Sequence, residues 1–207
     1  MEDRVADLLE AVASGEPAPG GGSVSALAGA LGAALGAMVL RITRDKQSGQ
    51  IPDEELAGLV EEMDCLRLEL QDAFAEDAES YRGVLEAFRL PRDDEALRVR
   101  RAEAIEAAMK RATEVPLATA RLCVRALEVL RQAAEQGYDQ AVTDAGVGAA
   151  VVYAGLTGSL YNVEVNLPSV RDPEFVAGTR GEVEALRRTG SESFRAVENR
   201  LKNALAD

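Results

Sequence analysis

Two long segments of the chain carry no charged residue, and they constrain the fold more than any other feature. They are residues 24–40 and residues 145–163. Both approach the roughly twenty predominantly apolar residues that a membrane-spanning helix needs. Gly, Ala, Ser and Thr make up much of both runs, so their hydrophobicity per residue is low, and the rest of the chain is amphipathic and highly charged. We therefore expect two buried central helices of a helical domain and no membrane span.

The composition favours helices throughout the chain. Ala is abundant, aromatic residues make up only 4% of the 207 residues, and runs typical of strands are scarce. We predict one all-α domain over residues 1–207, a helical bundle of five to seven helices with two Gly/Ala-rich central ones. The expected helices cover 2–14, 24–44, 53–88, 94–136, 140–163 and 173–205, with Ser23, Asp53 and Asp172 as N-caps and a kink or break at Pro116.

The charge and the missing residue types exclude several functions. The net charge of −13 argues against nucleic-acid binding, which needs a basic face. The chain has no His, which excludes the usual His-based metal sites and catalytic triads, and we expect no metal. Proton transfer would then use carboxylates, Lys, Tyr, Cys or water.

The cysteines and the N-terminus predict a cytoplasmic protein. Cys65 and Cys123 both fall inside helical patterns and are expected to be reduced core thiols. The first ten residues, "MEDRVADLLE", lack the basic and apolar regions of a signal peptide.

Glycines in the first uncharged run predict unusually close helix packing. Gly29, Gly32 and Gly36 fall on one helical face at spacings of three and four. Each costs about 1 kcal/mol relative to Ala in a helix, so close packing is the natural compensation. The packing partner is either another helix of this chain or a helix of a second subunit.

The stretch "PGGGS" before this run is either a simple connection or an anion-binding loop. It lacks the spacing and the Lys of a P-loop, and no strand precedes it. The free N–H groups at the start of the following helix would attract an anion.

Two acidic residues stand out from their helical patterns. Asp77 interrupts the apolar stripe of the helix expected at 53–88, so it is either a functional buried carboxylate or a residue at the edge of the stripe. Asp144 begins a small and polar helical face that is suited to lining a ligand cavity, unless it is an ordinary helix-start residue and the two Asn cap the other end. The members of this face are Asp144, Gly148, Val151, Gly155, Ser159, Asn162 and Asn166.

Five segments together resemble the cyclodeaminase/cyclohydrolase family. They are "PAPGGGSVSALAGALGAALGAMV", "DAESY" followed by "LEAFRLP", "EVPLATARLC", "TDAGVGAAVVYAG" and "NVEVNL", in the order and approximate spacing of the family. The resemblance covers nearly the whole chain. The family includes the C-terminal domain of formiminotransferase-cyclodeaminase and stand-alone bacterial methenyltetrahydrofolate cyclohydrolases.

The resemblance implies an all-α homodimer that acts on a tetrahydrofolate-type small molecule without a cofactor. The implied reaction is hydrolysis of 5,10-methenyltetrahydrofolate to 10-formyltetrahydrofolate. The alternatives are cyclodeamination of 5-formiminotetrahydrofolate with release of ammonia, a folate-binding protein without activity, and a helical dimerisation module. The implied catalytic residues are Asp77, Asp144 and Lys46, and the implied substrate-binding residues are Pro19, Gly20, Gly21, Gly22, Ser23, Asn162 and Asn166.

Two segments depart from the family pattern. In "GYDQAVTD", Tyr138 and Gln140 stand where the family often has Asn, and Thr143 replaces Ser. The Lys-rich segment after the first central helix is "RDKQSG" here and keeps only Lys46. The sequence therefore implies the family but does not choose between its two reactions.

Overall fold

The computed structural model describes residues 2–46 and 50–206 of the chain. This described part contains six α-helices, two short 3₁₀ turns and no strand, as the all-α prediction requires. The interval between the helices expected at 24–44 and 53–88 includes residues 47–49, which lie outside the described residues. The helices are α1 (Glu2–Ala13), α2 (Gly21–Asp45), α3 (Asp53–Arg89), α4 (Glu95–Gln136), α5 (Val142–Asn166) and α6 (Pro173–Ala206), with 3₁₀ turns at Asp139–Ala141 and Leu167–Ser169.

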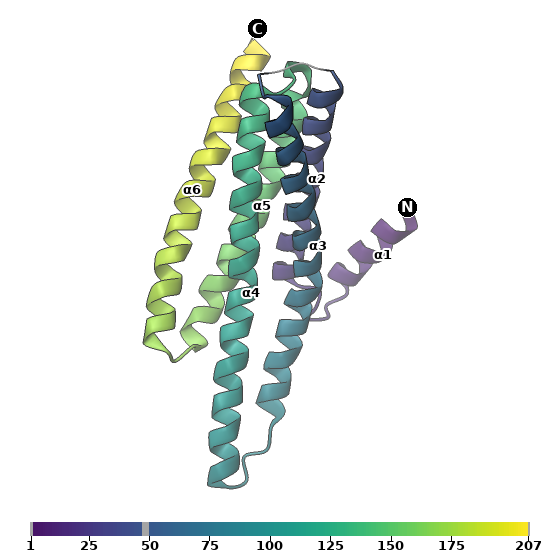
Figure 1. Cartoon of the computed structure of the whole chain (residues 1–207). Helices are drawn as coiled ribbons and strands as arrows, with labels where there is room; N and C mark the ends of the chain where they lie inside the picture. Colours follow the sequence, from purple (N-terminus) through teal and green to yellow (C-terminus); the bar gives the residue numbers. More distant parts are fainter. Residues whose placement is uncertain (1, 47–49, 207) are drawn as a thin grey trace.

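Helices α2 to α6 run up and down in an antiparallel bundle (Figure 1). Helix α4 contacts α2, α3, α5 and α6, and α2 packs most extensively against α5 and α3. The lower ends of α3 and α4 extend beyond the other helices as a two-helix arm, and α1 projects away from the bundle (Figure 1). Because α2 and α5 are antiparallel neighbours, α2 begins and α5 ends at the same level of the bundle.

The glycines of α2 allow its close approach to three helices of the same chain. A Cβ on Gly32 would lie 2.5 Å from the backbone oxygen of Gly148 on α5, and one on Gly29 would lie 3.0 Å from Cys123 Sγ on α4. Gly36 faces the side chains of Met63 on α3 and Leu130 on α4. All three positions are therefore filled from within the chain, and a dimerisation module packed through these glycines is excluded.

Some local predictions are wrong for identifiable reasons. Ser23 is not the N-cap of α2: the helix begins three residues earlier than expected, at Gly21, and the Ser23 hydroxyl donates a hydrogen bond to Asp77 on α3 instead. Asp53 is the first residue of α3, which follows Pro52 without a side-chain cap. Pro116 does not split α4, which stays continuous over 42 residues and packs against α2, α3, α5 and α6.

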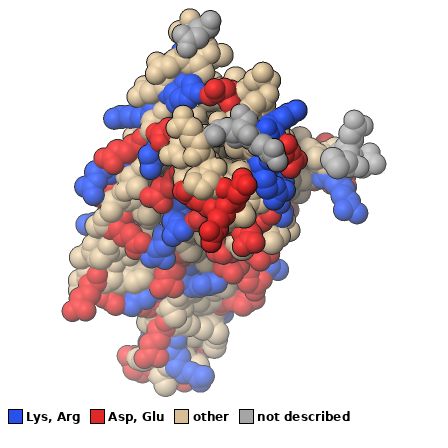
Figure 2. Space-filling view, turned by 45° about the horizontal axis from the view of Figure 1, so that its top comes forward, with Lys and Arg blue, Asp and Glu red and all other residues tan. Residues whose placement is uncertain are grey.

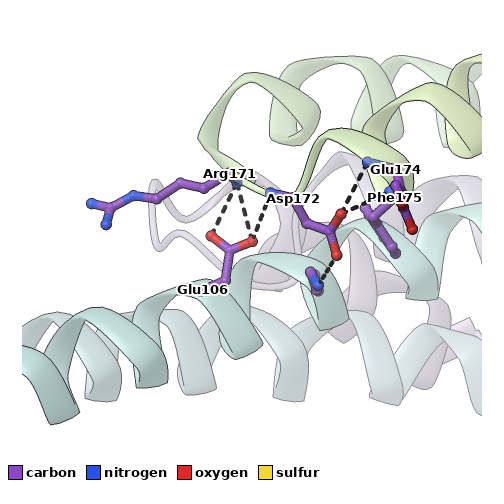
Figure 3. A network of polar contacts seen from close by, with 6 residues as sticks. Glu106, Arg171, Asp172, Glu174 and Phe175 are labelled. Atoms are coloured by element: carbon purple, nitrogen blue, oxygen red, sulfur yellow. Dashed lines mark hydrogen bonds and ion pairs between the residues drawn. The ribbon is translucent and has the colours of Figure 1, made fainter.

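Asp172 caps α6, as predicted, and also joins it to α4. Its carboxylate accepts hydrogen bonds from the backbone N–H groups of Glu174 and Phe175 and from Lys110 Nζ at 2.6 Å. One turn earlier on α4, the Glu106 carboxylate accepts hydrogen bonds from the backbone N–H groups of Arg171 and Asp172 (Figure 3). The network fixes the angle at which the chain enters α6.

Replacing Asp172 with Ala is expected to lower the Tm, and Asp172→Asn to lower it less, because Asn retains the capping oxygen. The hydrogen bond from Lys110, followed by the N–H of Phe175, holds the pKa of Asp172 below its ordinary value of 3.8. A lowered pKa stabilises the fold above the ordinary pKa, and this contribution is lost as the pH falls through the folded value. Thermal melts by circular dichroism should therefore show a Tm gap between wild type and Asp172→Ala at pH 7 that narrows at pH 3. A gap of equal size at both values would contradict this account.

The two cysteines differ in environment, so the expectation of two core thiols is only half right. Cys123 is fully buried on α4 beneath α2, and desolvation raises the pKa of its thiol to about 12. Cys65 is exposed on α3, and both are free thiols. Iodoacetamide at pH 8 should thus label Cys65 in the folded protein and Cys123 only after denaturation, as mass spectrometry of tryptic peptides would show. Equal labelling rates would mean that α4 opens readily.

One face of the molecule carries interleaved charges of both signs. Figure 2 shows acidic and basic side chains alternating over the face in view, without a large basic area. Within the described residues, α2 and α5 are long and apolar enough to cross a membrane, but 61% and 50% of their most apolar windows are buried inside the bundle. They are core helices, as expected, although each also leaves one apolar stripe exposed.

Candidate functional site

A cavity of about 280 Å³ lies where α2 begins, between the facing sides of α3, α4 and α5. Its lining combines the glycine loop with one carboxylate and two carboxamides. Most of the substrate-binding residues implied by the sequence thus lie together. The lining residues are Pro17, Ala18, Gly20, Gly21, Gly22, Asp77, Ala78, Ser80, Tyr81, Val84, Met109, Ala112, Asn162 and Asn166.

Asp77 is held against the first turn of α2. The Ser23 hydroxyl donates to Asp77 Oδ2 at 2.8 Å, and Ser23 itself is fully buried. Gly22 faces the same carboxylate so closely that any Cβ there would overlap it. The carboxylate is half-buried and lines the cavity.

The two carboxamides are oriented by backbone hydrogen bonds. Asn162 Nδ2 donates to the carbonyl of Gly158 at 2.8 Å, within α5. Asn166 Nδ2 donates to the carbonyl of Ala112 on α4, also at 2.8 Å. Both bonds use the amide N–H₂ groups, which leaves the side-chain oxygens as acceptors. Together with Asp77, they make this end of the cavity rich in acceptors.

The first turn of α2 supplies the complementary donors. No side chain caps the helix at Gly20, and its first N–H groups have no partner within the helix. Gly20, Gly21 and Gly22 line the cavity, so the partial positive charge of this helix end faces the cavity. Pro19 is half-buried beside them and is not among the lining residues.

Lys46 and Asp144 lie at the opposite end of the bundle. Lys46 is exposed and follows the last residue of α2, so it lies about 37 Å from Gly21 along a 25-residue helix. Asp144 lies in the first turn of α5, eighteen residues and therefore about 27 Å before Asn162. Tyr138 and Gln140, the departures from the family pattern, adjoin this second end. Within one chain, the implied site residues thus form two groups at opposite ends.

The polar face predicted on α5 lines the cavity only at its last two positions. A Cβ on Gly155 would lie 2.7 Å from the Ser25 carbonyl oxygen of α2, and one on Gly148 would lie 3.1 Å from that of Gly32. The middle of this face is therefore a helix-packing surface. Its small residues fit α2 and do not form a ligand cavity.

Tyr81 and Met109 are lining residues that the sequence did not assign to a site. Tyr81 lies one turn after Asp77 on the same apolar stripe. This spacing could have indicated that Tyr81 lies beside Asp77 in the cavity. Met109 belongs to α4 and carries no comparable signal. No group of three or more His, Cys, Asp or Glu side chains within 2–46 and 50–206 is arranged to hold a metal ion.

The described residues form an all-α domain with a cavity lined by one carboxylate, two carboxamides and a glycine-rich helix start. The family model described as formiminotransferase-cyclodeaminase matches residues 4–185. The chain belongs to this family, as its sequence motifs imply.

Relatives of both activities align over most of the chain. A methenyltetrahydrofolate cyclohydrolase of Methylorubrum extorquens is 35% identical over 184 residues, 89% of this chain and 88% of the relative. A formimidoyltransferase-cyclodeaminase of Sus scrofa is 30% identical over 94% of this chain, which spans only 36% of that longer protein. The crystal structure of a formiminotetrahydrofolate cyclodeaminase from Thermotoga maritima superposes with a TM-score of 0.86 at 27% identity and covers 96% of this chain and 95% of the other.

Proposed function

We propose that the protein is a methenyltetrahydrofolate cyclohydrolase, which hydrolyses 5,10-methenyltetrahydrofolate to 10-formyltetrahydrofolate. The observation that carries the proposal is the Asp77 carboxylate, which is oriented by Ser23 and lines a cavity that contains no Lys or Arg among its described lining residues. Such a site favours a cationic ligand. The match to the bacterial cyclohydrolase over nearly the full length of both chains supports the same activity.

The cavity chemistry fits the pterin end of a folate. A reduced pterin carries several N–H donors on one edge, and Asp77, Asn162 and Asn166 present acceptor oxygens. Its carbonyl oxygen is an acceptor, which the free N–H groups of Gly21 and Gly22 complement. The methenyl carbon then lies near Asp77, since this carboxylate is the anionic group that lines the cavity.

Hydrolysis requires few groups from the protein. Water attacks the methenyl carbon and forms a C–O bond, while one proton of that water passes to a base. The bond from this carbon to N5 then breaks, N5 takes up a proton, and the carbon remains on N10 as a formyl group. The overall change consumes one water and releases one proton. Asp77 stabilises the cationic carbon and is placed to accept the proton of the water.

Cyclodeamination is the second candidate, favoured by the high structural similarity to the Thermotoga maritima cyclodeaminase. In that reaction N10 attacks the formimino carbon, and the terminal nitrogen departs as ammonia after taking up a proton. The product is the methenyl compound, so both reactions pass through the same cationic carbon. The same cavity therefore suits both chemistries.

Two parallel assays on purified protein test the proposal. Loss of methenyltetrahydrofolate absorbance, faster than without enzyme, is the result expected of a cyclohydrolase. Release of ammonia from 5-formiminotetrahydrofolate is the result expected of a cyclodeaminase. Ligand binding without either rate would reject the enzyme, and absence of any folate effect on the Tm would reject folate binding altogether.

The resemblance to this family also supports two further proposals, that the enzyme is a homodimer and that it acts in the cytoplasm. Analytical ultracentrifugation tests the first proposal. Cell fractionation of the tagged full-length chain tests the second.

A further inference from the structure

Pro116 is a buried proline near the middle of α4, which runs without a break from Glu95 to Gln136. Proline is the least favourable residue in a helix interior, because it has no N–H for the helix and its ring crowds the preceding turn. Ala would fill a buried helical position without this cost. A proline at such a position therefore needs a compensating contact elsewhere in the molecule.

The carbonyl that Pro116 leaves without its helical donor is that of Ala112. In an α-helix the N–H of each residue bonds to the carbonyl four residues earlier, and proline has no N–H to give. Ala112 lines the cavity, and so does Met109 just before it on α4. The carbonyl without a helical donor therefore belongs to the turn of α4 that borders the candidate site.

Asn166 supplies the missing donor from another helix. Its Nδ2 donates to the Ala112 carbonyl oxygen at 2.8 Å, across 54 residues of sequence. Because a carbonyl only accepts, it selects the N–H₂ end of the carboxamide and turns the side-chain oxygen the other way. Asn166 lines the cavity, so this oxygen remains available there as an acceptor. Ala112 is buried, and pairing its carbonyl also stabilises the fold.

A carbonyl inside a regular helix is poorly placed for such a contact. It points along the helix axis at the N–H group four residues later, so a side chain of a neighbouring helix has little access to it. Asn162 uses a carbonyl of its own helix, since its Nδ2 donates to Gly158 at 2.8 Å. The bond of Asn166 crosses from α5 to α4 and needs a carbonyl that no N–H of α4 occupies. Pro116 provides one.

The backbone around Asn166 is held independently of its carboxamide. Leu167 follows Asn166 and is buried, and the 3₁₀ turn that it begins contacts α4. Just before Asn166 on α5, Val163 is fully buried. Rotation of the side chain is therefore the freedom that the Ala112 carbonyl removes. Pro116→Ala should keep the fold, since Ala is the better helix residue, and release this rotation.

We propose that Pro116 is a positioning residue: it frees the Ala112 carbonyl, which then holds the Asn166 oxygen toward the N–H donors of a bound pterin. The proposal rests on the proposed function and adds to it a residue that does not line the cavity. Pro116 acts through Ala112 and Asn166 and does not touch the substrate. With an N–H at position 116, this carbonyl would return to its helical bond and Asn166 would lose its fixed orientation.

A double-mutant cycle measured by steady-state kinetics tests the coupling. Pro116→Ala and Asn166→Ala are each expected to raise the KM for methenyltetrahydrofolate about tenfold, as for one lost hydrogen bond, with kcat close to wild type. The double variant should be no worse than either single variant, because both changes remove the same contact. An unchanged KM in Pro116→Ala, or a double variant in which the two effects multiply, would overturn the proposal.

An ester at position 116 is the matched control for Pro116→Ala. L-Lactic acid, introduced there by nonsense suppression, carries the methyl group of Ala but has an oxygen in place of the backbone N–H. It shares the missing donor with proline and the missing ring with Ala. We expect this ester to restore the KM that Pro116→Ala has raised. If the ester is as impaired as Pro116→Ala, the ring matters and the missing N–H does not, and the proposal fails.

NMR of the Asn166 carboxamide tests the hydrogen bond without any ligand. The side-chain N–H₂ signals of Asn166 are assigned by their loss in Asn166→Ala. A hydrogen-bonded amide proton resonates downfield, so these signals should move upfield in Pro116→Ala, while those of Asn162 stay in place. Unmoved Asn166 signals would overturn the proposal. If the wild type catalyses neither reaction, the proposed function fails, while these signals still decide whether Pro116 orients Asn166.

Discussion

Asp77→Asn is expected to lower kcat/KM for methenyltetrahydrofolate about 10²–10⁴-fold while the protein remains folded. The amide is nearly isosteric and still accepts the hydrogen bond from Ser23, which is 2.8 Å long in the wild type. It carries no negative charge, however, and therefore neither stabilises the methenyl cation nor takes a proton from water. The rate of methenyltetrahydrofolate loss and the Tm of the same preparation together measure the effect.

A neighbouring carboxylate provides the matched control. Glu76→Gln removes the same charge one residue earlier on α3, where Glu76 is exposed and pairs with Arg111 at 3.1 Å. We expect its activity to remain close to wild type. Glu76 is not among the residues that line the cavity, and a surface ion pair contributes little to the stability of the fold. If both variants lose activity equally, the general charge of this region matters, and Asp77 has no specific role. If Asp77→Asn stays fully active, the carboxylate is structural.

The fold was predictable because it depends on periodicity along the chain. The two uncharged runs became the central helices α2 and α5, and Asp172 capped α6 as its spacing before Pro173 indicated. These features depend on residues a few positions apart. Helix ends that depend on distant contacts were harder to predict from the sequence. Ser23 looks like an N-cap in the sequence, but its hydrogen-bond partner Asp77 lies 54 residues away.

The site was predictable in composition but not in arrangement. The glycine loop, Asp77, Asn162 and Asn166 do share a cavity, and the resemblance to the family had named all of them. No spacing in the sequence shows that Asp144 lies at the other end of the bundle from Asp77, because the two belong to different helices. Glycine spacing likewise predicted close packing by Gly29, Gly32 and Gly36 without telling whether the partner helix belonged to the same chain.

Gly32→Ala is expected to destabilise the protein by about 3 kcal/mol, at the upper end of the cost of overpacking a core. The new Cβ would overlap the Val152 side chain and lie 2.5 Å from the Gly148 backbone oxygen, so α2 and α5 would have to move apart. A backbone atom cannot rotate away as a side chain does, and α2 and α5 approach each other closely at this point. Urea denaturation followed by circular dichroism would measure the free energy of unfolding.

Gly58→Ala is the matched control for this substitution. Gly58 is an exposed position within α3, and a Cβ there would meet nothing within 4 Å. Since Ala is favoured over Gly in a helix by about 1 kcal/mol, Gly58→Ala should raise the free energy of unfolding. Opposite signs for the two variants would show that close approach, and not helix propensity, requires glycine at position 32. A neutral or stabilising Gly32→Ala would mean that the α2–α5 contact is looser than the structure indicates.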